Sequence, residues 1–165
     1  MTIEIRTIRP EDELLSWLDA QTTAFLERGI DIAKVAEEVR EHWDFSRIWG
    51  AIEGSRVVGT TRTYATELTV PGNRQVKASA VTQVAVRPTH RRRGLLRGML
   101  DAEHAAARER GEIVSILFAS ESGIYGRFGY GVSTETADWS IDTRETAFTD
   151  AAGGMTGSVE LLDID

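Results

Sequence analysis

The segment 84–97 constrains the fold of this chain more than any other part of the sequence. An apolar stretch that ends at Val86 is followed by the turn Pro-Thr-His-Arg-Arg-Arg-Gly and by a helical pattern that starts at Leu95. The first N–H groups of a helix have no acceptor inside it, so together with the helix dipole they form a site for an anion. Gly94 lets the backbone approach such an anion closely, because glycine has no Cβ. The segment therefore predicts a strand–turn–helix unit that binds a diphosphate.

The spacing of the apolar residues predicts a mixed α/β domain. Residues 113–119 are almost all apolar, which is typical of a strand that is buried on both faces. The expected strands are 3–8, 48–52, 57–68, 76–86, 113–119 and 137–141, and the expected helices are 10–29, 31–43, 95–110 and a short one near 124–125. In chain order the elements read β-αα-βββ-α-β-α-β.

Composition excludes several classes of protein. The 165 residues include no cysteine, which rules out a disulfide scaffold and a covalent thiol intermediate and fits a reducing cytoplasm. The net charge of −7 argues against nucleic acid as a partner, although the segment 87–97 carries five arginines. The polar first residues do not form a signal peptide, and no apolar run is long enough to cross a membrane. We therefore expect a cytoplasmic protein with no membrane partner.

Charge is unevenly distributed along the chain. Residues 1–44 hold eleven acidic and five basic side chains, whereas the arginines of 87–97 have no acidic neighbour within that segment. The three histidines are scattered and form neither a metal-binding set nor a catalytic triad. The sequence thus predicts two binding sites of opposite charge, one for a cation and one for an anion, and no metal site.

Two common phosphate-binding motifs are missing. The chain has no G-x-x-x-x-G-K-[ST] loop, and the glycines between 123 and 131 lack the spacing of the dinucleotide fingerprint. The acetyltransferase pattern R-x-x-G-x-(G/A) does match residues 91–96, except that Leu96 stands where a small residue is usual.

Two longer stretches carry a more specific resemblance. The words Val-x-Pro-Thr-His-Arg-Arg-Arg-Gly-Leu-Leu-Arg (86–97) and Ser-Glu-x-Gly-Ile-Tyr-Gly-Arg-Phe-Gly-Tyr-Gly (120–131) resemble the GCN5-related N-acetyltransferases. They are most similar to the N-terminal domain of the enhanced intracellular survival (Eis) acetyltransferases, which also carry Leu-Leu after the glycine. The resemblance implies the acetyltransferase fold, with a mixed central sheet that splays at the cofactor site. It also implies an acetyltransferase domain over 1–142, followed by a linker-like segment, 143–165, that would begin a second domain.

The resemblance implies acetyl-CoA as the acetyl donor. The backbone of Val84, Ala85 and Val86 would pair with the pantetheine arm, whose amides suit the unpaired groups of a splayed strand. Ser120 and Glu121 would line the adjoining edge. The residues expected to hold the pyrophosphate are Arg92, Arg93, Gly94, Leu95, Leu96 and Arg97.

The expected reaction is N-acetylation of a cationic acceptor by direct attack in a ternary complex. At the position of the family's proton-donating tyrosine stands Tyr125, which would act as general acid toward the departing thiolate. The acceptor would be an aminoglycoside-, polyamine- or lysine-like amine. Four residues of the first two helical segments are candidates to bind it, namely Phe25, Glu27, Trp43 and Asp44. Tyr130 and Phe128 are interpreted as packing residues.

The sequence is also compatible with a second function. In the resembling family a carboxylate at the far C-terminus of a longer chain acts as general base, whereas this sequence stops at Asp165. The alternative is therefore a catalytically incomplete, CoA-binding N-terminal domain of a longer multidomain acetyltransferase. The sequence leaves open both the identity of the acceptor and whether the protein is a homo-oligomer.

Overall fold

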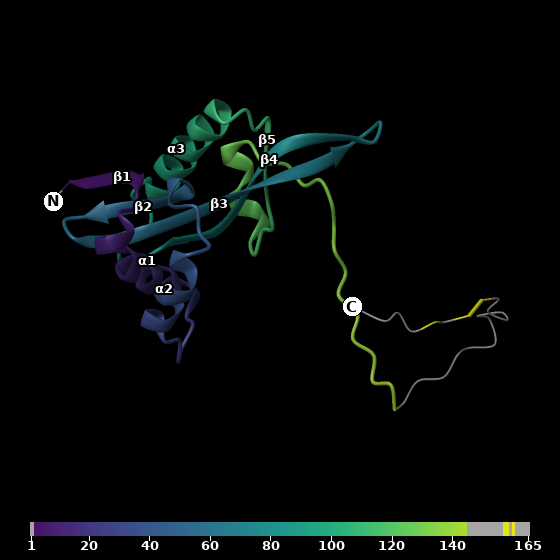
Figure 1. The fold of residues 1–165 in the computed structure, drawn as a ribbon, viewed down its shortest axis with the longest axis horizontal. Helices are drawn as coiled ribbons and strands as arrows, with labels where there is room; N and C mark the ends of the chain where they lie inside the picture. The colour runs from purple at the N-terminus through teal and green to yellow at the C-terminus, as the bar shows by residue number, and fades with distance from the viewer. Residues whose placement is uncertain (1, 145–156, 159, 161–165) are drawn as a thin grey trace. The chain divides into compact units, whose positions relative to one another are not determined.

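The computed structural model describes residues 2–144, 157, 158 and 160 (Figure 1). Contacts divide the chain into two units, Met1–Val132 and Ser133–Asp165. Within the described residues, every helix and strand belongs to the first unit.

The first unit is built on one five-stranded sheet. The strands are β1 (Ile3–Thr7), β2 (Ile48–Glu53), β3 (Arg56–Val70), β4 (Arg74–Val86) and β5 (Val114–Leu117). They lie in the order β1-β2-β3-β4-β5, and all neighbours are antiparallel except β4 and β5, which are parallel. The helices are α1 (Pro10–Phe25), α2 (Ile32–Arg40) and α3 (Leu95–Glu109). This architecture confirms the predicted mixed α/β fold class.

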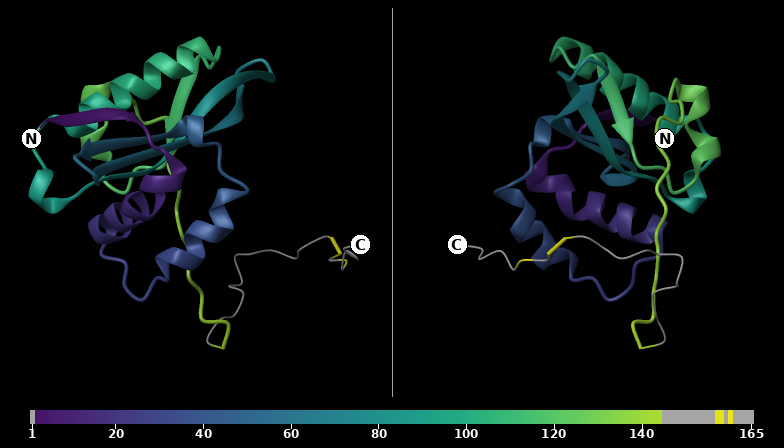
Figure 2. Two further views of the ribbon diagram at one scale, coloured as in Figure 1. Left: turned by 60° about the vertical axis from the view of Figure 1, so that its left-hand side comes forward. Right: turned by 90° about the vertical axis from the view of Figure 1, so that its right-hand side faces the viewer.

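The helices cover opposite faces of the sheet (Figure 2). On one face, α1 and α2 enclose a core around Leu14, Trp17 and Ile48. On the other face, α3 packs through Leu95 and Met99. Burial of these apolar side chains supplies the main stabilisation of a domain of this size.

A buried carboxylate fixes the start of α1 against β1. The Glu13 side chain is almost fully buried and accepts two hydrogen bonds from the Arg6 guanidinium at 2.7 and 2.8 Å. It also accepts the backbone N–H of Arg9, at 2.8 Å, at the N-terminus of the helix. The hydrogen bonds from Arg6 lower the pKa of Glu13 to about 2, so the carboxylate stays ionised near neutral pH.

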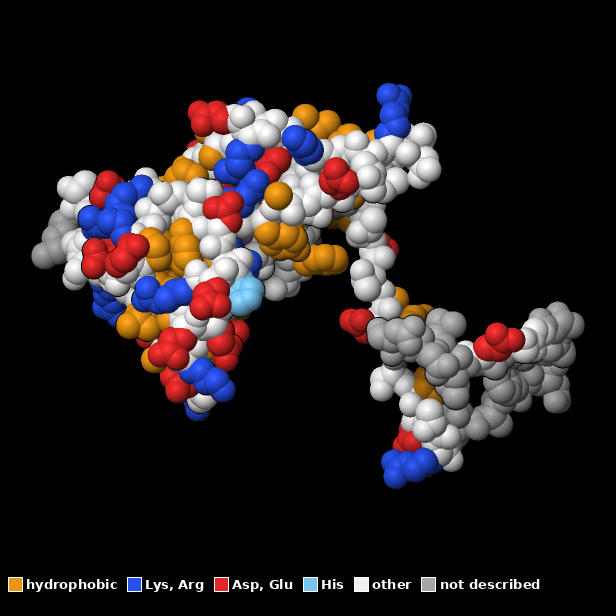
Figure 3. All heavy atoms as spheres, viewed as in Figure 1, with side chains coloured by type: hydrophobic (Ala, Val, Ile, Leu, Met, Phe, Trp, Pro, Cys, Tyr) orange, Lys and Arg blue, Asp and Glu red, His pale blue; other side chains and the backbone are white. Residues whose placement is uncertain are grey.

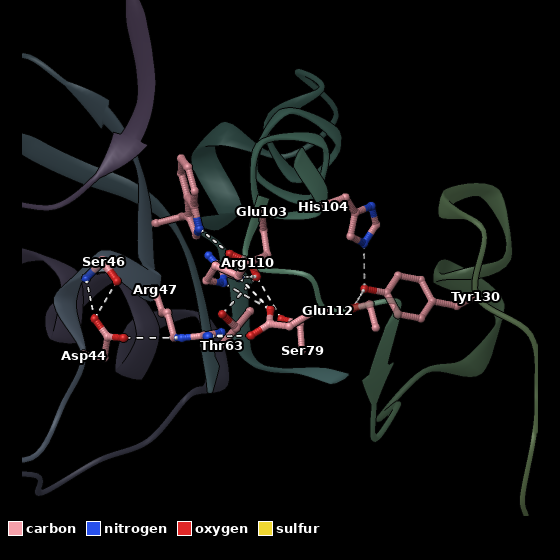
Figure 4. Close-up of polar contacts among 12 residues, drawn as sticks. Asp44, Ser46, Arg47, Thr63, Ser79, Glu103, His104, Arg110, Glu112 and Tyr130 are labelled. Carbon is pink, nitrogen blue, oxygen red and sulfur yellow. Dashed lines mark hydrogen bonds and ion pairs between the residues drawn. The ribbon is translucent and has the colours of Figure 1, made fainter. Parts of the chain in front are cut away.

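A second buried carboxylate ties α3 to the middle of the sheet (Figure 4). Glu103 is completely buried and accepts hydrogen bonds from Trp49 Nε1 at 2.6 Å, Ser79 Oγ at 2.8 Å and Thr63 Oγ1 at 3.1 Å. Its remaining partner is the Arg110 guanidinium, which also pairs with Glu112, itself paired with Arg47. One side chain therefore joins β2, β3 and β4 to α3.

The expected strand over 137–141 is wrong. Residues 133–142 have no regular structure, and their apolar side chains Trp139 and Ile141 are 87% and 67% exposed. Alternating apolar residues predict which side chains share a face, but a strand also needs a neighbour for its backbone groups. No described residue pairs with this stretch. The short helix expected near 124–125 is replaced by two 3-10 turns, Ser122–Ile124 and Gly126–Phe128. Most of the predicted linker-like segment 143–165 lies outside the described residues.

Replacing Glu103 by Gln tests the buried network. The substitution removes the charge that faces Arg110 and turns one acceptor oxygen into a donor, so buried donors lose their partner. We expect the free energy of unfolding, measured by urea denaturation, to fall by about 2–4 kcal/mol. The control is Glu109→Gln on the exposed side of the same helix, for which a change within about 0.5 kcal/mol is expected. Equal stability of the two variants would contradict the role of Glu103.

Candidate active site

The parallel strands β4 and β5 pair over only four residues and then separate. The ladder joins Ala78–Val81 to Val114–Leu117 and goes no further. On the other side of β4, the register with β3 shifts between Thr60 and Arg62, and Gln83 adopts a φ of +51°, which marks a bulge. Past the bulge, the backbone on the former β5 side of 84–86 has no partner strand among the described residues. The structure thus places Val84, Ala85 and Val86 along the open part of the sheet.

The helix start after β4 has the geometry expected of an anion site. Arg92 and Gly94 have φ angles of +64° and +78°, and no side chain caps α3. The N–H groups of its first turn, which includes Leu96, therefore remain available to an external acceptor. Arg92, Arg93 and Arg97 are all exposed around this turn, whereas the Leu95 side chain is buried in the core.

Only some of the nearby arginines are free. Arg93 donates to the Thr89 carbonyl at 3.2 Å but keeps an exposed side chain. Arg87, in contrast, is buried: its Nε donates to the Val57 carbonyl at 3.0 Å and its guanidinium pairs with Asp19 of α1. Of the five arginines in the segment 87–97, Arg87 is therefore a structural link between α1 and the end of β4.

Tyr125 lies in the segment that follows β5. Its side chain is half-buried, and desolvation together with the nearby Glu121 carboxylate raises the pKa of the phenol above its usual value. Ser120 and Glu121 are both exposed. Because β4 and β5 are parallel, the segment after β5 and the start of α3 lie at the same edge of the sheet.

A contact between those two elements supports this placement. The Arg97 guanidinium of α3 lies 5.1 Å from the centre of the Phe128 ring, within the range of a cation–π interaction. The 3-10 turn just after Tyr125 therefore touches the first turn of α3, and the general-acid candidate lies at the same edge of the sheet as the uncapped start of that helix.

A small cavity of about 100 Å³ opens between α1, α2 and β4. Two of the four predicted acceptor residues, Glu27 and Trp43, line it together with Leu18, Gln21, Thr22, Ile30, Ile32, Val35 and Gln83. Phe25 is 45% exposed and is not among these lining residues. Asp44 accepts from the backbone N–H and hydroxyl of Ser46, which lowers the pKa of its carboxyl, and it pairs with Arg47. Acidic side chains lie over α1 and α2 on the face shown in Figure 3, interspersed with basic ones.

Two residues near this cavity, Gln83 and Arg62, were not predicted from the sequence as site residues. Gln83 lines the cavity from the bulge of β4, directly before the open stretch of the strand. Arg62 places its guanidinium 4.1 Å from the centre of the Trp43 ring and donates to Gln83 Oε1 at 3.3 Å. Two successive polar residues, Thr82 and Gln83, interrupt the alternation of side chains just before the apolar end of this strand, and they were the signal that could have indicated the bulge.

The chain matches the family described as "Acetyltransferase (GNAT) domain" over residues 4–133. It therefore belongs to the GNAT acetyltransferases, and the predicted family is confirmed. No group of three or more His, Asp or Glu side chains that could hold a metal ion occurs in the described part of the chain. No helix of that part is long and apolar enough to span a bilayer.

Relatives within the family are similar to this chain over part of their length. An uncharacterized N-acetyltransferase of Streptomyces griseus is 40% identical over 166 residues, which is 99% of this chain and 40% of the relative. N-acetyltransferase Eis of Mycobacterium tuberculosis is 47% identical over 116 residues, 68% of this chain and 29% of Eis. The crystal structure of Eis1 from Mycobacterium abscessus superimposes with a TM-score of 0.68 at 34% identity, covering 78% of this chain and 31% of Eis1.

Gly94 offers a test of the helix start. A Cβ at this position would meet open space, so the only cost of Gly94→Ala is the left-handed φ of +78°. We expect a loss of about 1 kcal/mol in the free energy of unfolding. Gly131→Ala, where space is equally open and φ lies outside the left-handed region, should change stability far less. Thermal or urea unfolding measures both, and equal losses would argue against a strained cap.

Proposed function

We propose that this chain is an acetyl-CoA-dependent N-acetyltransferase that transfers an acetyl group to a primary amine of a cationic acceptor. Acetyltransferases of the GNAT family use acetyl-CoA as donor. The observation that carries the proposal is the separation of β4 from β5 beside the uncapped start of α3. The open backbone of β4 suits the amides of the pantetheine arm, and the uncapped start of α3 suits the pyrophosphate.

The donor is expected to lie along the open edge of β4. Its pantetheine amides would form hydrogen bonds with the free backbone groups of 84–86. Its pyrophosphate oxygens would accept hydrogen bonds from the backbone N–H groups at 92–97. Ser120 and Glu121 would border the same groove. A backbone N–H of the open stretch would polarise the thioester carbonyl, as donors of an oxyanion hole do.

The transfer needs a neutral amine and a proton for the departing thiolate. A lysine-like amine with a pKa near 10.4 is only about 0.04% neutral at pH 7, a deficit of about 4.6 kcal/mol that a carboxylate, a water or a dry site must offset. The attacking nitrogen forms the amide bond while the C–S bond breaks, and Tyr125 donates its proton to the sulfur. The proton that the nitrogen loses passes to water, and water returns a proton to the Tyr125 phenolate, so that the net reaction is amine plus acetyl-CoA to amide plus free CoA thiol. An ordinary phenol is already protonated at neutral pH. Burial raises the pKa of Tyr125 and makes it a weaker acid, so its proton moves to the sulfur only as the thiolate develops.

The cavity is large enough to hold one arm of a cationic acceptor but too small to enclose the whole molecule. Its volume of about 100 Å³ is below the roughly 300–1,000 Å³ of sites that enclose a drug-sized ligand. Glu27 supplies negative charge and Trp43 an aromatic wall, which together suit an alkylammonium arm. We therefore propose that a polyamine-, lysine- or aminoglycoside-like acceptor inserts one amine-bearing arm here.

The second candidate function is a catalytically incomplete CoA-binding domain. The chain spans about 40% of the length of the Streptomyces relative and about 30% of the Eis proteins, so a residue supplied by a longer chain could be required for catalysis. In this reading, residues 1–142 form the CoA-binding domain and 143–165 lead to a further domain. Binding of acetyl-CoA without any turnover would distinguish this function from the first.

Calorimetric titration tests the anion site. Replacing both Arg92 and Arg93 by Gln removes two exposed cations beside the start of α3 and should weaken acetyl-CoA binding about tenfold. Arg74→Gln, an equally exposed arginine at the β3–β4 turn, is the control and should bind within a factor of two of the parent protein. Unchanged affinity in the double variant would remove these arginines from the site.

Turnover tests Tyr125. With spermidine as probe acceptor, Tyr125→Phe should lower kcat at least about 100-fold, because general acids typically contribute that much, and leave the Kd for acetyl-CoA within a factor of two. Since the chain has no cysteine, a thiol reagent detects released CoA without background from the protein. Equal turnover in the Phe variant would contradict the assignment.

A further inference from the structure

We propose that Tyr130 is a positioning residue that holds Tyr125 in place, through a hydroxyl bound between α3 and β5. The inference rests on the proposed function only in taking Tyr125 as the general acid. The sequence interpretation of Tyr130 as a packing residue leaves out its hydroxyl, which the structure shows to be fully engaged.

Besides the contact of Phe128 with Arg97, the segment that carries Tyr125 has few attachments of its own. Residues 122–131 contain four glycines, and neither of its 3-10 turns buries a side chain. The backbone hydrogen bonds within the segment are all local, such as Phe128 N–H to the Tyr125 carbonyl at 2.9 Å. Among the described residues, its hydrogen bonds to the remainder of the domain all pass through the Tyr130 side chain.

The Tyr130 hydroxyl connects three elements. It lies 2.7 Å from Ser115 Oγ on β5 and 2.9 Å from His104 Nε2 on α3 (Figure 4). A phenol donates one hydrogen bond and accepts another, so these two partners saturate it. Burial lowers the pKa of His104, which keeps the imidazole neutral near pH 7 and able to accept at Nε2. Ser115 can then donate to the phenol oxygen.

Because the Tyr130 ring is held by its hydroxyl, it in turn restricts the position of the Tyr125 ring that it contacts. The two rings meet edge to face with centres 5.9 Å apart, a favourable geometry for an aromatic pair, and Tyr130 also contacts the His104 ring at 5.6 Å. A general acid displaced by about 1 Å can lose roughly two orders of magnitude in rate. A hydroxyl that fixes the neighbouring ring therefore controls the rate without touching the substrate.

Nuclear magnetic resonance can test this inference apart from the chemistry. The chain has only three tyrosines, so protein labelled with ring-¹³C tyrosine gives three sets of signals that the Tyr→Phe variants assign. In Tyr130→Phe and in Ser115→Ala, we expect the Tyr125 signals to shift and broaden as the ring samples more positions. Ser115→Thr, which retains a hydroxyl, should restore them. Tyr64→Phe, on an exposed part of β3, is the matched control and should leave them unchanged.

Kinetics supply the second readout. We expect Tyr130→Phe and Ser115→Ala to lower kcat about tenfold while KM for acetyl-CoA stays within a factor of two. A Tyr125 spectrum in either folded variant that matches the parent protein would overturn the inference. If Tyr125→Phe itself keeps full turnover, the proposed role of Tyr125 fails, but the NMR comparison still decides whether Tyr130 positions it.

Discussion

The parallel strands β4 and β5 share hydrogen bonds only between Ala78–Val81 and Val114–Leu117. Beyond these residues, β4 is paired with β3 alone. Buried or half-buried backbone groups without a partner cost free energy, so the open side of 84–86 needs either water or a bound chain of amides. The uncapped start of α3 lies directly after the same strand. The proposed donor site, the proposed anion site and the general-acid candidate all depend on this separation.

Two buried carboxylates hold the helices beside the separated strands firmly on the sheet. Glu103 holds the second half of α3 onto β2, β3 and β4, so the first half of the helix presents its N–H groups from a rigid base. Glu13 does the same for the start of α1, and the second half of that helix forms one wall of the proposed acceptor cavity. Such carboxylates are stable in the interior because every one of them has several donors.

Local patterns in the sequence were sufficient for much of this structure. The strand–turn–helix around Gly94 follows from residues close together in the chain, and the order of the elements follows from apolar periodicity. What could not be predicted depends on distant partners. Arg87 resembles its neighbouring arginines in sequence but is bound to Asp19, and Asp44 is taken up by Ser46 and Arg47. The stretch 137–141 alternates like a strand but has no described neighbour to pair with, and Tyr130 gains its role from His104 and Ser115.

The link between Arg87 and Asp19 also has a thermodynamic consequence. It joins the helix that lines the acceptor cavity to the residue that leads out of β4 toward the arginine turn. If an amine binds in the cavity and acetyl-CoA binds at the arginine turn, as proposed, this ion pair connects the two sites through α1 and the end of β4. Linkage makes such an effect reciprocal: if the amine strengthens or weakens attachment of the coenzyme by some factor, the coenzyme changes the affinity for the amine by that same factor.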